Sequence, residues 1–173
     1  LGDVYKRQKQ YLFENLIRKK GNVIVDETIP EFKRIKKISI SRKLKLQTLN
    51  NSKNQFQILS HCFRGEKQIL KIKYNNLTRE INLNLIGKIQ LKNILMAILA
   101  AKNSNLSLIK ILNVLSKLKP IDGRFEKIGK IKNKSKVILD YAHTPDALRI
   151  CLSNLKEQFP NKKIILLFGC GGN

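Results

Sequence analysis

The sequence predicts an α/β fold, and the evidence is strongest towards its C-terminal end. Two short apolar runs, residues 136–141 and 162–169, are rich in Val, Ile, Leu and Phe, as buried strands are. The segment between them, residues 145–159, carries apolar side chains at helical spacing: Leu148, Leu152, Leu155 and Phe159. Strand, helix and strand in this order predict a βαβ unit with a right-handed crossover.

The composition is that of a globular protein with one domain or two small ones in its 173 residues. No apolar run approaches the roughly 20 residues of a membrane-spanning helix. No signal peptide is visible, so we expect a soluble cytoplasmic protein without membrane insertion. The cysteines Cys62, Cys151 and Cys170 are too widely spaced to form a disulfide framework or a metal-binding motif.

The formal net charge of +23 raises the hypothesis of nucleic-acid binding. Lys, Ile and Asn are over-used together along the chain, however, as in proteins from AT-rich genomes. The lysines form no single basic block, and aromatic residues that could stack on bases are few. We therefore expect no nucleic-acid partner and keep a basic nucleic-acid-binding protein as an alternative. A positive field would also attract small anionic substrates.

The first third of the chain predicts few regular elements. Residues 1–8, LGDVYKRQ, resemble a translated sequencing adapter, so we exclude them from the fold prediction as an artefact. Residues 9–20 predict a helix, and residues 22–26 a short buried strand. The basic segment 29–49 predicts a connector with one short strand at 37–41.

Three successive strands are predicted at residues 55–62, 68–74 and 79–86, with a tight turn at 75–76 between the last two. The third has the alternation of apolar and polar residues of a half-buried strand. His61 lies in the first strand without partners at motif spacing, so we expect it to be structural.

Two helices are predicted at residues 91–102 and 106–118. Pro, Asp and Gly end the helical pattern after residue 119, which predicts a domain boundary there. The chain is thus divided into residues 9–120 and 121–173. The basic run 127–136, beyond the boundary, predicts a solvated loop.

Polar residues gather where the strands of the predicted βαβ unit end. Asp140 and His143 follow the first strand, and Gly169 follows the second. Ligands of open parallel sheets bind at this carboxyl edge. The carboxylate of Asp140 suits ribose hydroxyls, or else caps the following turn. Thr144 is a good N-cap for the following helix.

The guanidinium of Arg124, close to the predicted boundary, suits phosphate because it is a planar fork of donors that stays charged. The alternative is a solvated surface arginine.

The chain resembles the Mur ligases of peptidoglycan synthesis, in particular the tripeptide-forming branch. The resemblance is carried by three motifs in the order and spacing of that family: GRFE (123–126), DYAHTPDAL (140–148) and FGCGGN (168–173). The resemblance implies cell-wall ligases that use ATP and Mg²⁺ to join a free amino acid, diaminopimelate or lysine, to UDP-N-acetylmuramoyl-L-Ala-D-Glu through an acyl phosphate. It also implies that residues 9–120 end a central ATP-binding domain and that residues 121–173 begin a Rossmann-like, amino-acid-binding C-terminal domain.

The resemblance also implies the site residues. Asn93 would approach the adenine of ATP, with Gln90 in place of a second family asparagine; Arg124 would face the nucleotide, Asp140 the ribose and His143 the phosphates. The substrate loop would contain Gly171, Gly172 and Asn173.

The phosphate-binding G-x-x-G-K-[TS] loop of the family does not occur in this sequence, nor do the family's Mg²⁺ ligands. We therefore expect a truncated, monomeric chain that holds no catalytic residue and is inactive alone. Other ligases of this fold, of the cyanophycin or folylpolyglutamate type, and a non-catalytic paralogue remain alternatives.

Overall fold

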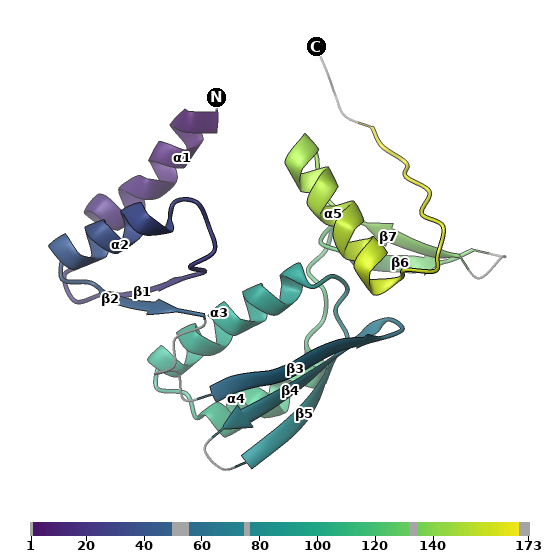
Figure 1. The fold of residues 1–173 in the computed structure, drawn as a ribbon, viewed down its shortest axis with the longest axis horizontal. Coiled ribbons are helices and arrows are strands. Elements are labelled where there is room, and N and C mark those ends of the chain that lie inside the picture. Colours follow the sequence, from purple (N-terminus) through teal and green to yellow (C-terminus); the bar gives the residue numbers. More distant parts are fainter. Residues whose placement is uncertain (1, 50–55, 75–76, 132–134, 170–173) are drawn as a thin grey trace. The chain divides into compact units, whose positions relative to one another are not determined.

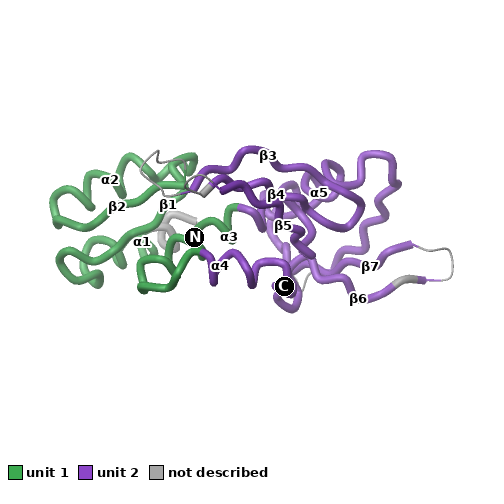
Figure 2. The backbone as a smooth tube through the Cα atoms, turned by 90° about the horizontal axis from the view of Figure 1, so that it is seen from below, with its two compact units in different colours: residues 1–55, 92–108 green, residues 56–91, 109–173 purple. Residues whose placement is uncertain are grey.

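The computed structural model describes residues 2–49, 56–74, 77–131 and 135–169 as a mixed α/β structure (Figure 1). The chain divides into two compact units (Figure 2). Unit 1 comprises residues 1–55 and 92–108, and unit 2 comprises residues 56–91 and 109–173. None of the helices among the described residues is long and apolar enough to cross a membrane.

Unit 1 contains a small parallel sheet. Strand β1 (Asn22–Val25) pairs in parallel with β2 (Lys45–Thr48), and helix α2 (Phe32–Ser41) lies between them in sequence. Apolar side chains of β1 and α2, with one from the residue directly before β2, form the core of the unit: Val23, Val25, Ile35 and Leu44. The predicted strand at 22–26 is confirmed.

Helix α2 replaces the connector and the short strand predicted at residues 37–41. The alternation of KISIS over these five residues imitates a strand, but the buried side chains of the segment, Ile35 and Ser39, are four residues apart. This spacing places both on one side of a helix.

The first helix is also displaced from its predicted range. Helix α1 (Gly2–Tyr11) continues as one π-helical turn (Leu12–Leu16), and Ile17 is already extended. The predicted helix at 9–20 is therefore four residues too long at its C-terminal end. Residues 2–8, which we excluded as adapter-derived, are helical here, and their exclusion stays a prediction.

Unit 2 is built on an antiparallel sheet in the order β3–β4–β5, which confirms the three predicted strands. Their bounds are Phe56–Arg64, Lys67–Tyr74 and Leu77–Leu83. The central strand β4 is the most buried, with Leu70 and Ile72 almost inaccessible. The turn predicted at 75–76 lies outside the described residues.

The two predicted helices are confirmed as α3 (Ile89–Asn103) and α4 (Leu108–Val114), the latter extended by a 3₁₀ turn (Leu115–Lys117). In unit 2, Arg79 of β5 donates to Oδ1 of Asn113 at 2.7 Å. This hydrogen bond joins α4 to the sheet.

The predicted βαβ unit is formed only in part. Strand β7 (Lys136–Leu139) and helix α5 (Pro145–Gln158) are confirmed. The second strand, predicted at 162–169, is wrong: the segment pairs with none of the described strands. Its apolar side chains are exposed, Ile165 by 79% and Leu167 by 93%. A strand needs a partner for its backbone hydrogen bonds, and apolar composition cannot supply one.

Strand β7 pairs instead with β6 (Glu126–Lys130) in an antiparallel ribbon. The solvated loop predicted at 127–136 is therefore wrong for residues 127–130, which belong to β6, and for Lys136, which begins β7. The lysines of this run are compatible with a strand because its neighbouring side chains alternate between two faces.

Candidate functional site

Two of the predicted motifs meet through the carboxylate of Asp140. The N–H of Phe125, in GRFE, donates to Oδ2 of Asp140 at 3.0 Å, and the N–H of Ala142 donates to Oδ1 at 2.9 Å. A third hydrogen bond runs from the N–H of Tyr141 to the carbonyl oxygen of Gly123 at 2.9 Å. Asp140 therefore positions both loops, in addition to any contact with a ligand.

The GRFE loop has an unusual backbone. Phe125 has a φ of +48°, which costs a non-glycine residue about 1–3 kcal/mol. The buried Phe125 ring packs with Ile86 and Cys151, so burial and the hydrogen bond to Asp140 hold this conformation. Glu126 closes the loop by accepting a hydrogen bond from the N–H of Gly123 at 2.7 Å. The sequence pattern singled out Arg124 in this motif and gave no role to Phe125.

Three exposed side chains line up beside these loops. The guanidinium carbon of Arg124 lies 5.4 Å from the centroid of the Tyr141 ring. The Tyr141 ring meets the His143 ring edge-on, with centroids 5.0 Å apart. Nδ1 of His143 lies 3.0 Å from the carbonyl oxygen of Tyr141. Because a carbonyl only accepts, Nδ1 carries the hydrogen, and Nε2 is the ring nitrogen left for a ligand.

The helix after His143 begins as predicted. Oγ1 of Thr144 accepts a hydrogen bond from the N–H of Ala147 at 3.2 Å, and Pro145 occupies the first turn. Thr144 is thus the N-cap of α5. Capping fixes the beginning of α5 directly after His143.

Gln90 and Asn93 both lie near the beginning of α3. Their spacing of three residues puts them on the same side of that helix. Gln90, in unit 2, is half-buried, and its N–H donates to the carbonyl oxygen of Gly87 at 3.1 Å. Asn93, in unit 1, is exposed.

The predicted substrate loop, Gly171, Gly172 and Asn173, lies outside the described residues, as does Cys170. In unit 2 the structure brings together Arg124, Asp140 and His143. Tyr141, which contacts both Arg124 and His143, was part of the quoted motif but was not selected as a site residue.

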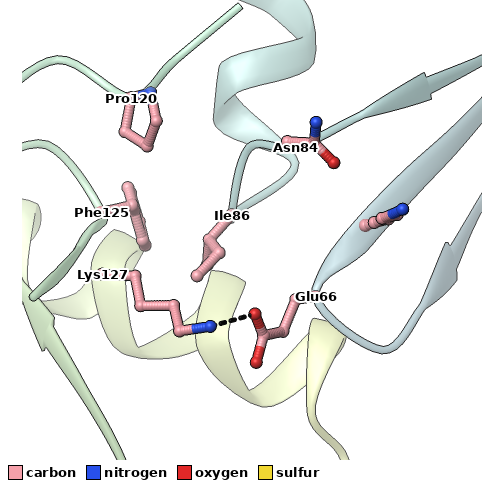
Figure 3. A pocket seen from close by; sticks show the side chains of 7 residues that line it. Glu66, Asn84, Ile86, Pro120, Phe125 and Lys127 are labelled. Carbon is pink, nitrogen blue, oxygen red and sulfur yellow. Dashed lines mark hydrogen bonds and ion pairs between the residues drawn. The ribbon is translucent and has the colours of Figure 1, made fainter. Parts of the chain in front are cut away.

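A small cavity of about 110 Å³ adjoins the GRFE loop (Figure 3). Its lining residues are Glu66, Lys67, Asn84, Ile86, Pro120, Phe125 and Lys127. The Lys127 ammonium lies 2.5 Å from the Glu66 carboxylate, which also pairs with Lys136 at 3.1 Å. The hydrogen bond from Lys127 holds the pKa of Glu66 below its ordinary value, although burial opposes this. Pockets for small ligands measure about 300–1,000 Å³, so the cavity is too small for a nucleotide.

The polar groups beside the two loops fit a nucleotide. Each carboxylate oxygen of Asp140 accepts one N–H and keeps a further lone pair for a ribose hydroxyl. Arg124 offers donors for a phosphate. The described residues contain no group of three His, Cys, Asp or Glu side chains that could hold a metal.

The fold is mixed α/β, and its two loops place an exposed arginine, a half-buried carboxylate and an exposed imidazole beside the beginning of a helix. Residues 123–173 match the family "Mur ligase, glutamate ligase domain". The chain is 30% identical over 169 residues to the UDP-N-acetylmuramoyl-L-alanyl-D-glutamate--2,6-diaminopimelate ligase of Rickettsia felis, and the match covers 97% of this chain and 30% of that protein. Nearly the whole chain is thus similar to a Mur ligase, and its C-terminal part matches a domain of that family. The chain spans about a third of the length of the curated relatives it matches.

Solved structures share the fold. MurF from Acinetobacter baumannii matches with a TM-score of 0.72 at 18% identity, over 90% of this chain and 33% of that chain. A structure described as an FPGS-AMPPCP-folate complex matches with a TM-score of 0.65 at 19% identity, over 84% and 36% of the two chains. At this identity the similarity shows the fold alone. It confirms the predicted α/β Mur ligase fold.

Proposed function

We propose that the chain is a segment of an ATP-dependent ligase that joins 2,6-diaminopimelate to UDP-N-acetylmuramoyl-L-Ala-D-Glu in cell-wall synthesis. The sequence alone left diaminopimelate and lysine open as the third amino acid. The name of the Rickettsia relative supports diaminopimelate. ATP would supply the phosphoryl group that activates the substrate carboxylate.

One observation carries the proposal within this chain. GRFE and DYAH, two motifs predicted to face the nucleotide, are hydrogen-bonded to each other through Asp140 and Phe125. In this arrangement Arg124 would neutralise phosphate charge, and His143 would orient a phosphate through the same exposed face. Asp140 would accept a ribose hydroxyl with its remaining lone pairs.

Other parts of the site are proposed on the family resemblance. Gln90 and Asn93 would approach the adenine, because an amide can both donate to and accept from its edge. Gly171, Gly172 and Asn173 would belong to the substrate loop. Residues 9–120 and 121–173 would belong to the central and C-terminal domains of a cytoplasmic, monomeric enzyme whose Mg²⁺ ligands lie in its other segments.

The fold does not distinguish this ligase from one of the folylpolyglutamate or cyanophycin type. The match to the Rickettsia protein, at 30% identity over nearly the whole chain, favours the tripeptide-forming ligase. No contact in the described residues favours the alternative of a nucleic-acid-binding protein, which rests on the net charge of +23 alone.

The proposal is tested at the genomic locus. We expect the reading frame that encodes residues 9–169 to encode a G-x-x-G-K-[TS] loop upstream. We expect its full product to incorporate labelled diaminopimelate into UDP-N-acetylmuramoyl-L-Ala-D-Glu only with ATP, and the 173-residue chain to have no such activity. A full product without ligation activity would refute the proposal, and ligation by the 173-residue chain would refute our view that other segments are essential.

A further inference from the structure

Two buried glutamines in unit 2 hold one short segment, the entry to helix α3. Gln68 of β4 is fully buried, and its Nε2 donates to the carbonyl oxygens of Leu85 at 2.9 Å and Gly87 at 3.0 Å. Its Oε1 lies 2.8 Å from Nε2 of His61. Since Oε1 only accepts, Nε2 of His61 carries the hydrogen. His61 thus completes the bonding of a buried amide, which is a structural role.

The second glutamine comes from α5. Gln158 is 4% exposed; its Oε1 accepts from the N–H of Gly87 at 2.8 Å, and its Nε2 donates to the carbonyl oxygen of Gly65 at 3.1 Å. One turn earlier, Oδ1 of Asn154 accepts from the N–H of Ile89 at 2.9 Å. Ile89 is the first residue of α3, where backbone N–H groups have no partner within the helix. Asn154 therefore caps α3 from another helix.

Gly87 is enclosed by side chains as well as hydrogen-bonded. Its φ is +87°, and a Cβ at this position would lie 3.3 Å from the Phe125 ring and 3.5 Å from Cβ of Asn154. The entry to α3 thus contacts the GRFE loop and α5 at the same residue. A shift of either would displace it, because a packed interior transmits strain.

Helix α5 connects this entry to the other motif. It begins at the Thr144 cap, directly after His143, and ends at Gln158, about 21 Å further on for 14 residues. Its N-terminal end therefore adjoins the residues predicted to face ribose and phosphate. In its C-terminal half, Asn154 and Gln158 bind the backbone directly before Gln90, at the beginning of α3.

We propose that Asn154 and Gln158 are positioning residues of the nucleotide site: from α5 they fix the beginning of α3, and with it Gln90. This inference rests on the proposed function, because it assumes that Gln90 and the DYAH loop contact the same nucleotide. Their side chains are bonded to the backbone of Gly65, Gly87 and Ile89, so we assign them no direct contact with the nucleotide.

The test uses the 173-residue chain and ADP. Asn154→Ala removes the cap but keeps a residue that favours helix, so the variant is expected to fold. We expect faster hydrogen exchange at the Ile89 amide and a dissociation constant for ADP raised about tenfold, as for one lost hydrogen bond. Asn154→Asp keeps the accepting oxygen and should stay within about twofold of the wild type. So should Lys156→Ala, an exposed control on the same helix.

Two results would overturn the inference, and they are distinguishable. If the Ile89 amide exchanges faster in Asn154→Ala while ADP binds as in the wild type, the positioning role is wrong and the nucleotide site stands. If the wild-type chain does not bind ADP, the nucleotide site itself is refuted, and the positioning role with it. Gln158→Met, which loses both the acceptor for Gly87 and the donor to Gly65, provides a second variant, with an expected loss of affinity at least as large as that of Asn154→Ala.

Discussion

The backbone N–H of Phe125 and the carboxylate of Asp140 are joined by a hydrogen bond of 3.0 Å. The bond links GRFE to DYAH across 15 residues of sequence, and it holds Phe125 in a left-handed conformation. Asp140 is thus a structural residue of the loop pair even without a ligand. Its substitution should affect stability as well as nucleotide binding.

We expect Asp140→Asn to lower the free energy of unfolding by about 1–3 kcal/mol. An asparagine has one accepting oxygen, so either the N–H of Phe125 or that of Ala142 loses its acceptor. Urea denaturation measures the change. Asp122→Asn, at an exposed position nearby, is the matched control and should change stability by less than about 0.5 kcal/mol. Equal effects of the two substitutions would show that the carboxylate of Asp140 does not hold the loops.

Gly87→Ala should be more destabilising than Gly65→Ala. Both glycines have positive φ, +87° and +63°, so both alanines adopt a strained backbone. Only at Gly87 would the new Cβ press on the Phe125 ring, at 3.3 Å, whereas nothing lies within 4 Å of a Cβ at Gly65. The melting temperatures of both variants separate the backbone strain, which the two share, from the contact with Phe125, which only Gly87→Ala makes. Equal decreases in melting temperature would mean that the GRFE loop moves away from the new Cβ without loss of stability.

The carboxylate of Asp26 should contribute to stability at neutral pH and lose this contribution in acid. Burial tends to raise the pKa of Asp26, but hydrogen bonds from Lys92, at 2.6 Å, and from Thr28 outweigh it and leave the pKa below its ordinary value of 3.8. A lowered pKa in the folded state makes the contribution complete above the ordinary value, and it disappears as pH falls through the folded value.

Removal of the lysine tests this balance. In Lys92→Met, burial acts without the ion pair, so the pKa of Asp26 should rise, and acid destabilisation should begin at higher pH. A carboxyl-detected NMR titration measures the pKa directly. Lys110→Met, an exposed position on α4, should leave Asp26 unchanged. An unchanged pKa of Asp26 in Lys92→Met would show that Lys92 does not lower the pKa of this carboxyl group.

The two described cysteines should differ in reactivity. Burial, with a smaller effect of the Asp140 charge, raises the pKa of the Cys151 thiol to about 11, whereas Cys62 is exposed. At pH 8 about one Cys151 in a thousand would be a thiolate. Iodoacetamide should therefore modify Cys62 first, as followed by peptide mass spectrometry. The stability that the buried thiol contributes is complete below about pH 9 and is lost as pH rises towards 11. Faster modification of Cys151 would contradict its burial.

The local elements of the fold could be predicted from the sequence where one periodicity extends over enough residues. Helix α5 and the strands β3, β4 and β5 are examples. The prediction failed at α2, where five alternating residues imitate a strand, and at residues 162–169, where apolar content was read as a paired strand. Pairing depends on a distant partner, which local pattern does not reveal.

The candidate site shows the same division. Arg124, Asp140 and His143 could be selected from the sequence because guanidinium, carboxylate and imidazole groups near strand ends suit a nucleotide. The bond between Gln158 and Gly87 could not, because 71 residues separate them and Gln158 belongs to no motif. Phe125 was missed because an apolar residue inside a polar motif gives no sign of a positive φ.

The most direct test of the account is a titration of the ¹⁵N-labelled chain with ADP. We expect saturable shifts at the amides of Arg124, Tyr141 and His143. The dissociation constant should rise about tenfold or more in Arg124→Ala, because a charge-assisted hydrogen bond is lost. Arg149→Ala, which removes an exposed arginine of α5, should leave it unchanged. Chemical shift changes confined to other amides, or equal weakening of ADP binding by both substitutions, would contradict the account. ADP would then be bound only by the overall positive charge of the chain, and the two motifs would form no nucleotide site.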